Sequence, residues 1–316
     1  MSSTPRWPRP VEQLPHGSGI GTECRIAQAA QLACLLEVSA PKPGNVNRQN
    51  DFPDTRFEDF LLSAVAIGPA MGCAGRTSVG QTIWRAVRDT RLLVGCNTNL
   101  GIVLLLAPLA RACLKPPHLL RSRSLANSIG AAQTEELREH LARVLATLTV
   151  QDARRTYAAI RLAHPGGLGQ TSEADVAEEP RVTLYQAMAL AQERDAVARE
   201  YVTDFAITFG IGYPALRSAW QGSGDFSGAI VQAFLTILAL VPDTLIARKR
   251  GTQVAAQVSG WARETLSLGG AFTAPGRASL RELDASLRDK GHTLNPGTTA
   301  DLTTAAIFLL LLVDGR

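Results

Sequence analysis

The sequence predicts an all-α protein, a compact multi-helix bundle with polar ligand-binding connections at one end. Apolar residues recur three and four positions apart through most of the chain, which is the period of an amphipathic helix. The sequence contains no run of alternating β-branched residues bounded by turns and no repeat of fixed length. The chain has 316 residues, of which 46% are hydrophobic and 19% are charged, so it is long enough to bury a large core.

Four predicted helices with short connections make up the first third of the chain. The first begins at Thr22 and keeps its apolar residues at helical spacing as far as Leu36. It ends before Pro41 and Pro43, since proline cannot continue a helix. The next three begin near Phe57, Val79 and Leu100. Short connections between such helices favour antiparallel hairpins.

Residues 21–316 are predicted to form a single helical catalytic domain. Its longest irregular stretch, "HPGGLGQTSEADVAEEP" at about 164–180, is predicted to be a mobile lid or a junction between subdomains. Residues 1–20 contain four prolines and no long apolar stretch. We therefore expect a flexible tail there, not a signal or transit peptide.

Composition limits the class of partner and the compartment. The net charge of +4 is spread along the chain, which does not favour nucleic-acid binding. The longest apolar runs fall short of the roughly 20 residues that cross a bilayer, so no membrane span is expected. The five cysteines form no Cys-x-x-Cys pair and are interpreted as reduced core residues of a cytoplasmic protein. The five histidines show no ligand spacing, so no zinc site is predicted.

Four connections between apolar helices are rich in glycine, amides and acids. They are "PKPGNVNRQNDFPD" (41–54), "GCNTNLG" (95–101), "PDTLIARKRG" (242–251) and "LNPGTTAD" (294–301). One interpretation is helix capping by Asn97, Asn295 and Asp54, whose side-chain oxygens satisfy unpaired helix N–H groups. The other is a ligand site, because "NTN" and "NVNRQND" supply more polar groups than one cap needs.

The ligand-site interpretation predicts a polyphosphate site at the mouth of the bundle. Glycine beside a helix start lets backbone N–H groups approach an anion, which the helix dipole also favours. Lys42 and the run Arg248 to Arg250 are expected to neutralise phosphates, and aspartates to hold Mg²⁺, which prefers oxygen ligands. Glu37 is a candidate base or metal ligand, with an exposed last-turn carboxylate as the alternative. None of the four segments is a Walker or Rossmann motif.

The stretches "LEVSAPKPGNVN", "NTNLGIVLLLAPL" and "NPGTTADLTTAAIFLL" resemble the triphosphoribosyl-dephospho-CoA synthase family, the ATP:dephospho-CoA triphosphoribosyltransferases. The resemblance runs from about Ile26 to Val313, with the motifs in the same order. It implies an all-α transferase that moves the 5-triphosphoribosyl group of ATP to the 2′-hydroxyl of 3′-dephospho-CoA and releases adenine. Such a displacement passes through an oxocarbenium-like state and needs a carboxylate base.

The resemblance also implies a cofactor, Mg²⁺, and partners, namely ATP and a phosphorylated coenzyme precursor such as dephospho-CoA. An oligomer is compatible with the sequence. The predicted catalytic carboxylates are Glu37, Asp51 and Asp54, and the predicted metal ligands are Asp54, Asp243 and Asp301. The residues predicted to bind substrate are Lys42, Gly44, Asn45, Asn47, Asn97, Thr98, Asn99, Gly101, Arg248, Lys249, Arg250, Asn295 and Gly297.

The first connection departs from the usual family pattern in two places. The amide Asn47 replaces the acid of Pro-Lys-Pro-Gly-Leu-Val-Asp, and "DFPD", ending in Asp54, replaces a His-x-Asp-Met element. The residues of this segment resemble those of a divergent branch of the family that is associated with tetrahydromethanopterin-linked one-carbon metabolism. Two alternatives therefore stay open: an ATP- or phosphate-dependent enzyme acting on another coenzyme precursor of C1-carrier biosynthesis, and a non-catalytic nucleotide-binding helical regulator.

Overall fold

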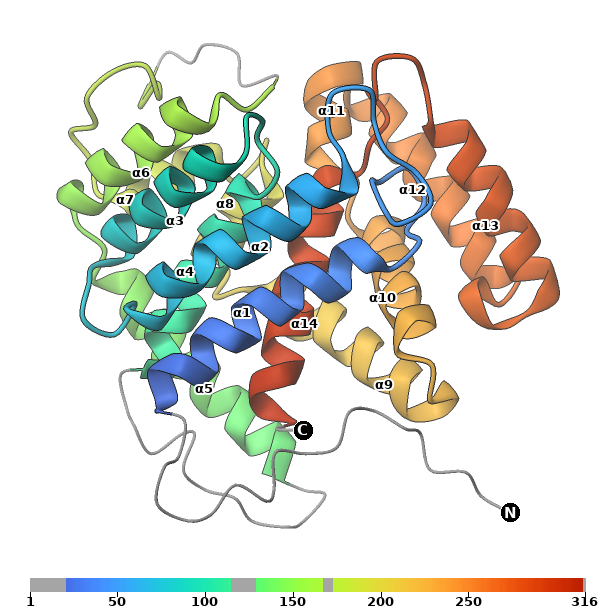
Figure 1. The fold of residues 1–316 in the computed structure, drawn as a ribbon, viewed down its shortest axis with the longest axis horizontal. Coiled ribbons are helices and arrows are strands. Elements are labelled where there is room, and N and C mark those ends of the chain that lie inside the picture. The colour runs from blue at the N-terminus through green and yellow to red at the C-terminus, as the bar shows by residue number, and fades with distance from the viewer. Residues whose placement is uncertain (1–20, 115–128, 167–172, 315–316) are drawn as a thin grey trace.

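The computed structural model describes residues 21–114, 129–166 and 173–314 (Figure 1). Within these ranges the chain forms fourteen α-helices and no β-strand, which confirms the predicted all-α class. The predicted flexible tail, residues 1–20, lies outside the described residues, as do residues 167–172 of the predicted irregular segment. The described parts of that segment contain no helix.

The first four helices begin where the sequence predicts them. They are α1 (Thr22–Ser39), α2 (Phe57–Gly72), α3 (Val79–Leu93) and α4 (Leu100–Leu114). The middle of the chain forms α5 (Ile129–Ala146), α6 (Val150–Ala163), α7 (Leu184–Ala191), α8 (Ala196–Val202) and the π-helical turn η1 (Thr208–Gly212). The last third forms α9 (Tyr213–Ser223), α10 (Phe226–Leu240), α11 (Thr244–Arg250), α12 (Thr252–Ser267), the 3₁₀ turn η2 (Gly270–Phe272), α13 (Ala274–Leu287) and α14 (Gly297–Val313).

Helices α1 and α2 run side by side in opposite directions, and α2 in turn packs against α3 (Figure 1). The antiparallel pairing predicted for this first hairpin is therefore confirmed. Helix α6 packs on α3 through Asp152, whose Oδ1 accepts a hydrogen bond of 2.9 Å from the Gly80 amide. A side chain at position 80 would bring its Cβ to 2.5 Å from Cα of Asp152, so this close helix packing requires glycine.

Helix α14 occupies the centre of the bundle, in contact with α1 and α4 on one side and with α9 and α10 on the other (Figure 1). Its residues from Leu302 to Leu310 are all buried, as expected for a helix that is apolar on every face. Within the described ranges, no helix by itself has the length and apolar composition needed to cross a membrane, although α10 and α11 meet that requirement as a pair bent by 53°.

Candidate functional site

The four polar connections meet around one cavity of about 590 Å³, as the sequence analysis expects. Helices α4, α8, α11 and α14 all begin at its wall. Among the predicted site residues, those that line the cavity are Glu37, Asn45, Asp54, Asn97, Thr98, Asn99, Gly101, Arg248, Lys249, Asn295, Gly297 and Asp301. The predicted residues that do not line it are Lys42, Gly44, Asn47, Asp51, Asp243 and Arg250.

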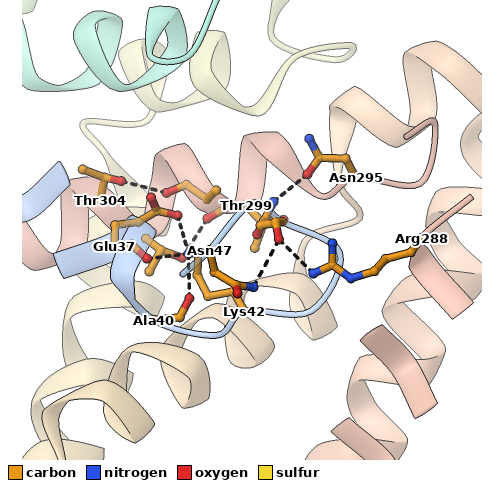
Figure 2. Close-up of polar contacts among 11 residues, drawn as sticks. Glu37, Ala40, Lys42, Asn47, Arg288, Asn295, Thr299 and Thr304 are labelled. Carbon is orange, nitrogen blue, oxygen red and sulfur yellow. Dashed lines mark hydrogen bonds and ion pairs between the residues drawn. The ribbon is translucent and has the colours of Figure 1, made fainter. Parts of the chain in front are cut away.

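A buried ion pair closes the end of α1 (Figure 2). Nζ of Lys42 lies 3.0 Å from Oε1 of Glu37 and also donates to the carbonyl oxygens of Glu37 and, at 3.3 Å, of Ala40. Lys42 is 0% exposed. All three hydrogens of its ammonium group thus have partners inside the turn. Lys42 does not line the cavity and has no hydrogen left to donate to a phosphate there. Lys42 is the cation whose charge compensates the burial of Glu37.

Glu37 presents its carboxyl group to the cavity from the last turn of α1. Burial raises the pKa of this carboxyl above its ordinary value, and the charge of Lys42 opposes that shift. Glu37 is only 4% exposed, which excludes the alternative of an exposed last-turn carboxylate.

Asp301 is the second carboxyl group on this wall, in the second turn of α14. Burial raises its pKa well above the ordinary value, and the nearby charge of Glu37 raises it further. Within the described part of the chain, no hydrogen-bond donor or ion-pair partner holds this carboxyl group. A Cβ at Gly101 would lie 2.5 Å from Cγ of Asp301. Glycine at the start of α4 therefore lets this helix approach the carboxyl group directly.

The starts of α4 and α14 offer backbone N–H groups to the cavity. Asn97 caps α4 by accepting a hydrogen bond of 3.2 Å from the Leu100 amide, so the capping interpretation is right for Asn97. Asn99 donates to Oγ1 of Thr90 at 3.1 Å and fastens the connection to α3. Helix α14 has no side-chain cap from Pro296, and Asp243 instead accepts from the Thr299 amide in its first turn, so the capping interpretation is wrong for Asn295.

Cationic groups come from the last turn of α11. Arg248 forms an ion pair of 2.6 Å with Asp195, and its Nε is buried without a partner in the described part of the chain. Lys249 donates to the carbonyl oxygen of His292 at 3.2 Å. Nη1 of Arg250 donates a hydrogen bond of 3.2 Å to Oγ1 of Thr293, and the side chain is half exposed and does not line the cavity. Of the four predicted phosphate-binding cations, Arg248 and Lys249 therefore reach the cavity, and Lys42 and Arg250 do not line it.

Amide groups form a bridge between the first and last connections (Figure 2). Nδ2 of Asn45 donates to Oδ1 of Asn295 at 2.5 Å, while Oδ1 of Asn45 is buried with no partner among the described residues. Arg288 of the last third donates to the Asn45 carbonyl oxygen at 3.0 Å. The unpartnered oxygen marks a place where a ligand hydroxyl or amino group would be satisfied.

Asn47 and Gly44 shape the first connection from behind the cavity. Oδ1 of Asn47 accepts from the Gln49 amide at 3.0 Å and closes a tight turn. Gly44 has φ +75°, donates its amide hydrogen to Asp284 at 2.8 Å, and leaves no room for a side chain against Leu287. The structure thus uses Gly44 for packing against α13, whereas the sequence analysis expects it to admit an anion.

Two predicted acids serve as helix caps. Asp51 is exposed and accepts from the Phe57 amide at 2.7 Å, at the start of α2. Asp243 accepts from the Leu245 and Ile246 amides at 2.9 and 3.0 Å, and from the amide and hydroxyl of Thr299 at 2.7 and 2.8 Å. Both oxygens of Asp243 are thus occupied, and this geometry does not support its assignment as a metal ligand.

Asp54 lies at the exposed edge of the cavity and accepts from the Thr55 hydroxyl at 3.3 Å. In the described part of the chain, no three His, Cys, Asp or Glu side chains converge as a metal site would require. This arrangement is compatible with Mg²⁺ that arrives on a polyphosphate, because such an ion usually takes only one or two protein carboxylates. The carboxyl groups on the wall are those of Asp54, Glu37, Asp195 and Asp301, of which Glu37 is paired with Lys42 and Asp195 with Arg248.

Sequence reasoning missed several residues of the wall, among them Asp195, His292 and His164. The sequence indicates a helix cap at Asp195, and Asp195 does cap α8 by accepting from the Val197 amide at 2.8 Å. Nothing in the neighbouring sequence indicates its ion pair with Arg248. Phe52 stands within the first predicted connection and stacks on His292. The two histidines lie in irregular segments without motif spacing, so only the fold reveals their position.

The fold and the cavity define an all-α protein with a cavity lined by acidic, amide and cationic side chains. The chain belongs to the ATP:dephospho-CoA triphosphoribosyl transferase family, whose profile matches residues 23–316. A similar protein from Pseudomonas savastanoi pv. phaseolicola, named "Probable 2-(5''-triphosphoribosyl)-3'-dephosphocoenzyme-A synthase", is 29% identical over 308 residues, which are 90% of each chain. A protein of the same name from Pseudomonas putida is 34% identical over 105 residues, so the match spans 33% of this chain and 37% of that relative.

A solved structure has a similar fold. It is a crystal structure from Archaeoglobus fulgidus, described as a candidate triphosphoribosyl-dephospho-coA synthase, with a TM-score of 0.60 and 28% sequence identity. The similarity covers 81% of this chain and 100% of that one. Family and fold therefore agree with the resemblance found in the sequence.

Proposed function

We propose that this protein transfers the 5-triphosphoribosyl group of ATP to the 2′-hydroxyl of 3′-dephospho-CoA and releases adenine. The observation that carries the proposal is the position of two carboxyl groups, Glu37 and Asp301, on one wall of a cavity where the start of α14 and the cations of α11 also meet. The membership of the chain in the transferase family supports the same reaction.

Asp301 is the residue best placed to accept the proton of the attacking hydroxyl. Its carboxyl group has no partner within the described ranges, whereas Glu37 is committed to Lys42. The raised pKa of Asp301 suits this role, because a general base works best when its pKa lies near the operating pH. Glu37 contributes a nearby negative charge that raises the basicity of Asp301.

The triphosphate is not the leaving group, since it stays on the product. Its negative charge must nevertheless be neutralised while it is bound. Arg248 and Lys249 supply positive charge to the same cavity, which suits an anchored polyphosphate. Mg²⁺ bound with ATP supplies further charge neutralisation, and Asp54 at the exposed edge is the carboxylate that we assign to it. The Asn45 oxygen, which has no partner among the described residues, and the Asn295 amide group are suited to sugar hydroxyls.

The test is to incubate the protein with ATP, Mg²⁺ and 3′-dephospho-CoA and to separate the products by chromatography. We expect adenine in equal amounts with a product whose mass is that of dephospho-CoA plus ATP minus adenine. Coenzyme A in place of dephospho-CoA serves as a control acceptor. Formation of ADP or pyrophosphate would contradict the mechanism. Binding of ATP without any product would instead support a nucleotide-binding regulator.

A further inference from the structure

Arg91, in the last turn of α3, is a cation of the cavity wall that the sequence analysis does not single out. Its side chain lines the cavity beside the connection 95–101, which lines it too. Among the described residues, the other lysine and arginine side chains of the wall are Arg248 and Lys249 of α11. The wall thus has one cation that the predicted phosphate site does not include.

The guanidinium group of Arg91 is held at one nitrogen and open at two others. Nη1 donates to the Gly95 carbonyl oxygen. Nε and Nη2 have no hydrogen-bond partner among the described residues, and neither belongs to the unpartnered nitrogens that are shut off from open space. Arg248 differs, because its Nε is shut off in this way and its Nη1 is committed to Asp195. The open nitrogens of Arg91 can therefore donate to a ligand in the cavity.

No carboxylate balances the charge of Arg91 within the described part of the chain. Arg88 of the same helix shows the contrast, since it forms an ion pair of 2.6 Å with Asp89 and does not line the cavity. The bond from Arg91 to Gly95 fastens the connection that follows α3, and one N–H group suffices for that. It leaves the positive charge and the other two nitrogens without a structural role.

Arg91 and the cations of α11 reach the cavity from different parts of the fold. Helix α3 packs against α2, α4 and α6, whereas α11 packs against α12 and α14. Figure 1 shows α3 on the left and α11 near the top of the molecule. The cavity therefore has one cationic edge at the end of α3 and another at the last turn of α11.

The proposed reaction brings two polyphosphate chains into this cavity. ATP carries a triphosphate, and dephospho-CoA carries the diphosphate that joins its adenosine to its pantetheine arm. Like charges repel strongly where water is excluded, so each chain needs cations of its own. The longer chain suits the edge with two cations, at α11. The shorter chain suits Arg91, because the fork of N–H donors on a guanidinium group matches the oxygens of a phosphate.

We propose that Arg91 binds the diphosphate of the acceptor, at a subsite separate from the one that α11 offers to the triphosphate. This inference rests on the proposed triphosphoribosyl transfer. At neutral pH the diphosphate is the only charged group of 3′-dephospho-CoA. Removal of the positive charge of Arg91 therefore acts on the affinity for the acceptor through this group.

The test measures the binding of each substrate separately by isothermal titration calorimetry, with ATP and Mg²⁺ in one series and 3′-dephospho-CoA in the other. The variant is Arg91→Gln, which removes the charge and keeps an N–H donor for the Gly95 carbonyl oxygen. We expect the dissociation constant of dephospho-CoA to rise by about 10- to 100-fold, and that of ATP to change by less than about twofold. Lys249→Gln should show the opposite pattern.

Arg88→Gln is the matched control, because Arg88 lies one turn earlier on α3 and does not line the cavity. It should leave both dissociation constants at their wild-type values. Arg91→Lys keeps the charge and should recover part of the affinity for dephospho-CoA. If Arg91 only fastened the connection 95–101, Arg91→Gln would instead lower the thermal midpoint and weaken the binding of both substrates.

Three results overturn the assignment. They are an unchanged affinity of Arg91→Gln for dephospho-CoA, a loss of affinity for ATP as large as that for dephospho-CoA, and the same loss in Arg88→Gln. Adenine release by the wild type is measured in parallel. A wild type that binds both substrates without releasing adenine contradicts the proposed function, while the binding series still decides the role of Arg91. Circular dichroism establishes that each variant is folded, and Arg91→Met, with the same expected pattern, replaces the glutamine variant if that one is not.

Discussion

Gly101→Ala should reduce turnover strongly while leaving the protein folded. The added Cβ would lie 2.5 Å from Cγ of Asp301, whereas ordinary contacts begin at 3.4 Å. The Asp301 carboxyl group must therefore retreat by about 1 Å, and a misplacement of about 1 Å in a reacting group can cost about 10²-fold in rate. The displaced atoms are the end of a side chain beside a cavity, so the fold can absorb the shift. We expect kcat for adenine release to fall by about 10²-fold.

Gly260→Ala is the matched control variant for this prediction. Gly260, inside α12, has only Arg263 Nη2 within 4 Å of its hypothetical Cβ, at 3.8 Å. Gly260→Ala should keep the wild-type kcat and gain up to about 1 kcal/mol of stability, because alanine is the better helix former. Each variant would be measured by adenine release under saturating ATP and by urea unfolding. A Gly101→Ala protein with wild-type kcat would refute the close approach of α4 to Asp301 or its role in the reaction.

Three further predictions concern the buried charges. Asp301→Asn should lower kcat by about 10²- to 10⁴-fold with an unchanged dependence on Mg²⁺ concentration; recovery of activity at high Mg²⁺ would make Asp301 a metal ligand instead of the base. Lys42→Met should destabilise the fold by about 3–5 kcal/mol in urea unfolding, since it leaves Glu37 buried without its partner, and Glu37→Gln in the same chain should recover part of the loss. Burial raises the pKa of Glu200 to about 7, so its contribution to stability is complete below pH 4.5 and disappears as the pH rises through 7. Between these values the wild type should lose about 3 kcal/mol more than Glu200→Gln, as measured by unfolding at pH 4.5 and pH 8; equal slopes for the two proteins would exclude this carboxyl group as the cause.

The prediction for Glu200 depends on a turn that the sequence does not announce. Its carboxylate accepts from the Ile207 amide at 3.1 Å and from the amide and hydroxyl of Thr208 at 2.6 and 2.9 Å. Asp204 and Phe205 between them both have left-handed backbones. Helical spacing alone favours an uninterrupted helix through this region, and the break there is visible only in the folded chain.

Much of the site could be predicted because its segments carry local signals. Pro41 and Pro43 end α1 wherever that helix packs, and glycine with amides at a helix start indicates a polar function in any fold. Residue type alone does not say which donor a side-chain oxygen will meet, which is why Asn295 is not the predicted cap and why the geometry does not support Asp243 as a metal ligand. Asp243 meets Thr299, 56 positions away, and Asn295 meets Asn45, 250 positions away.

The sequence by itself determined the all-α class, the starts of the first four helices and the four polar connections, because helix periodicity and turn chemistry act over a few residues. Only the tertiary structure decided that these connections share one cavity, that Lys42 is buried against Glu37 while Asp301 has no hydrogen-bond partner among the described residues, and that His292 reaches Phe52. The physical reason is the central position of α14. Its apolar surface is buried against α1, α4, α9 and α10, and that packing brings the acid of its second turn to the glycine at the start of α4.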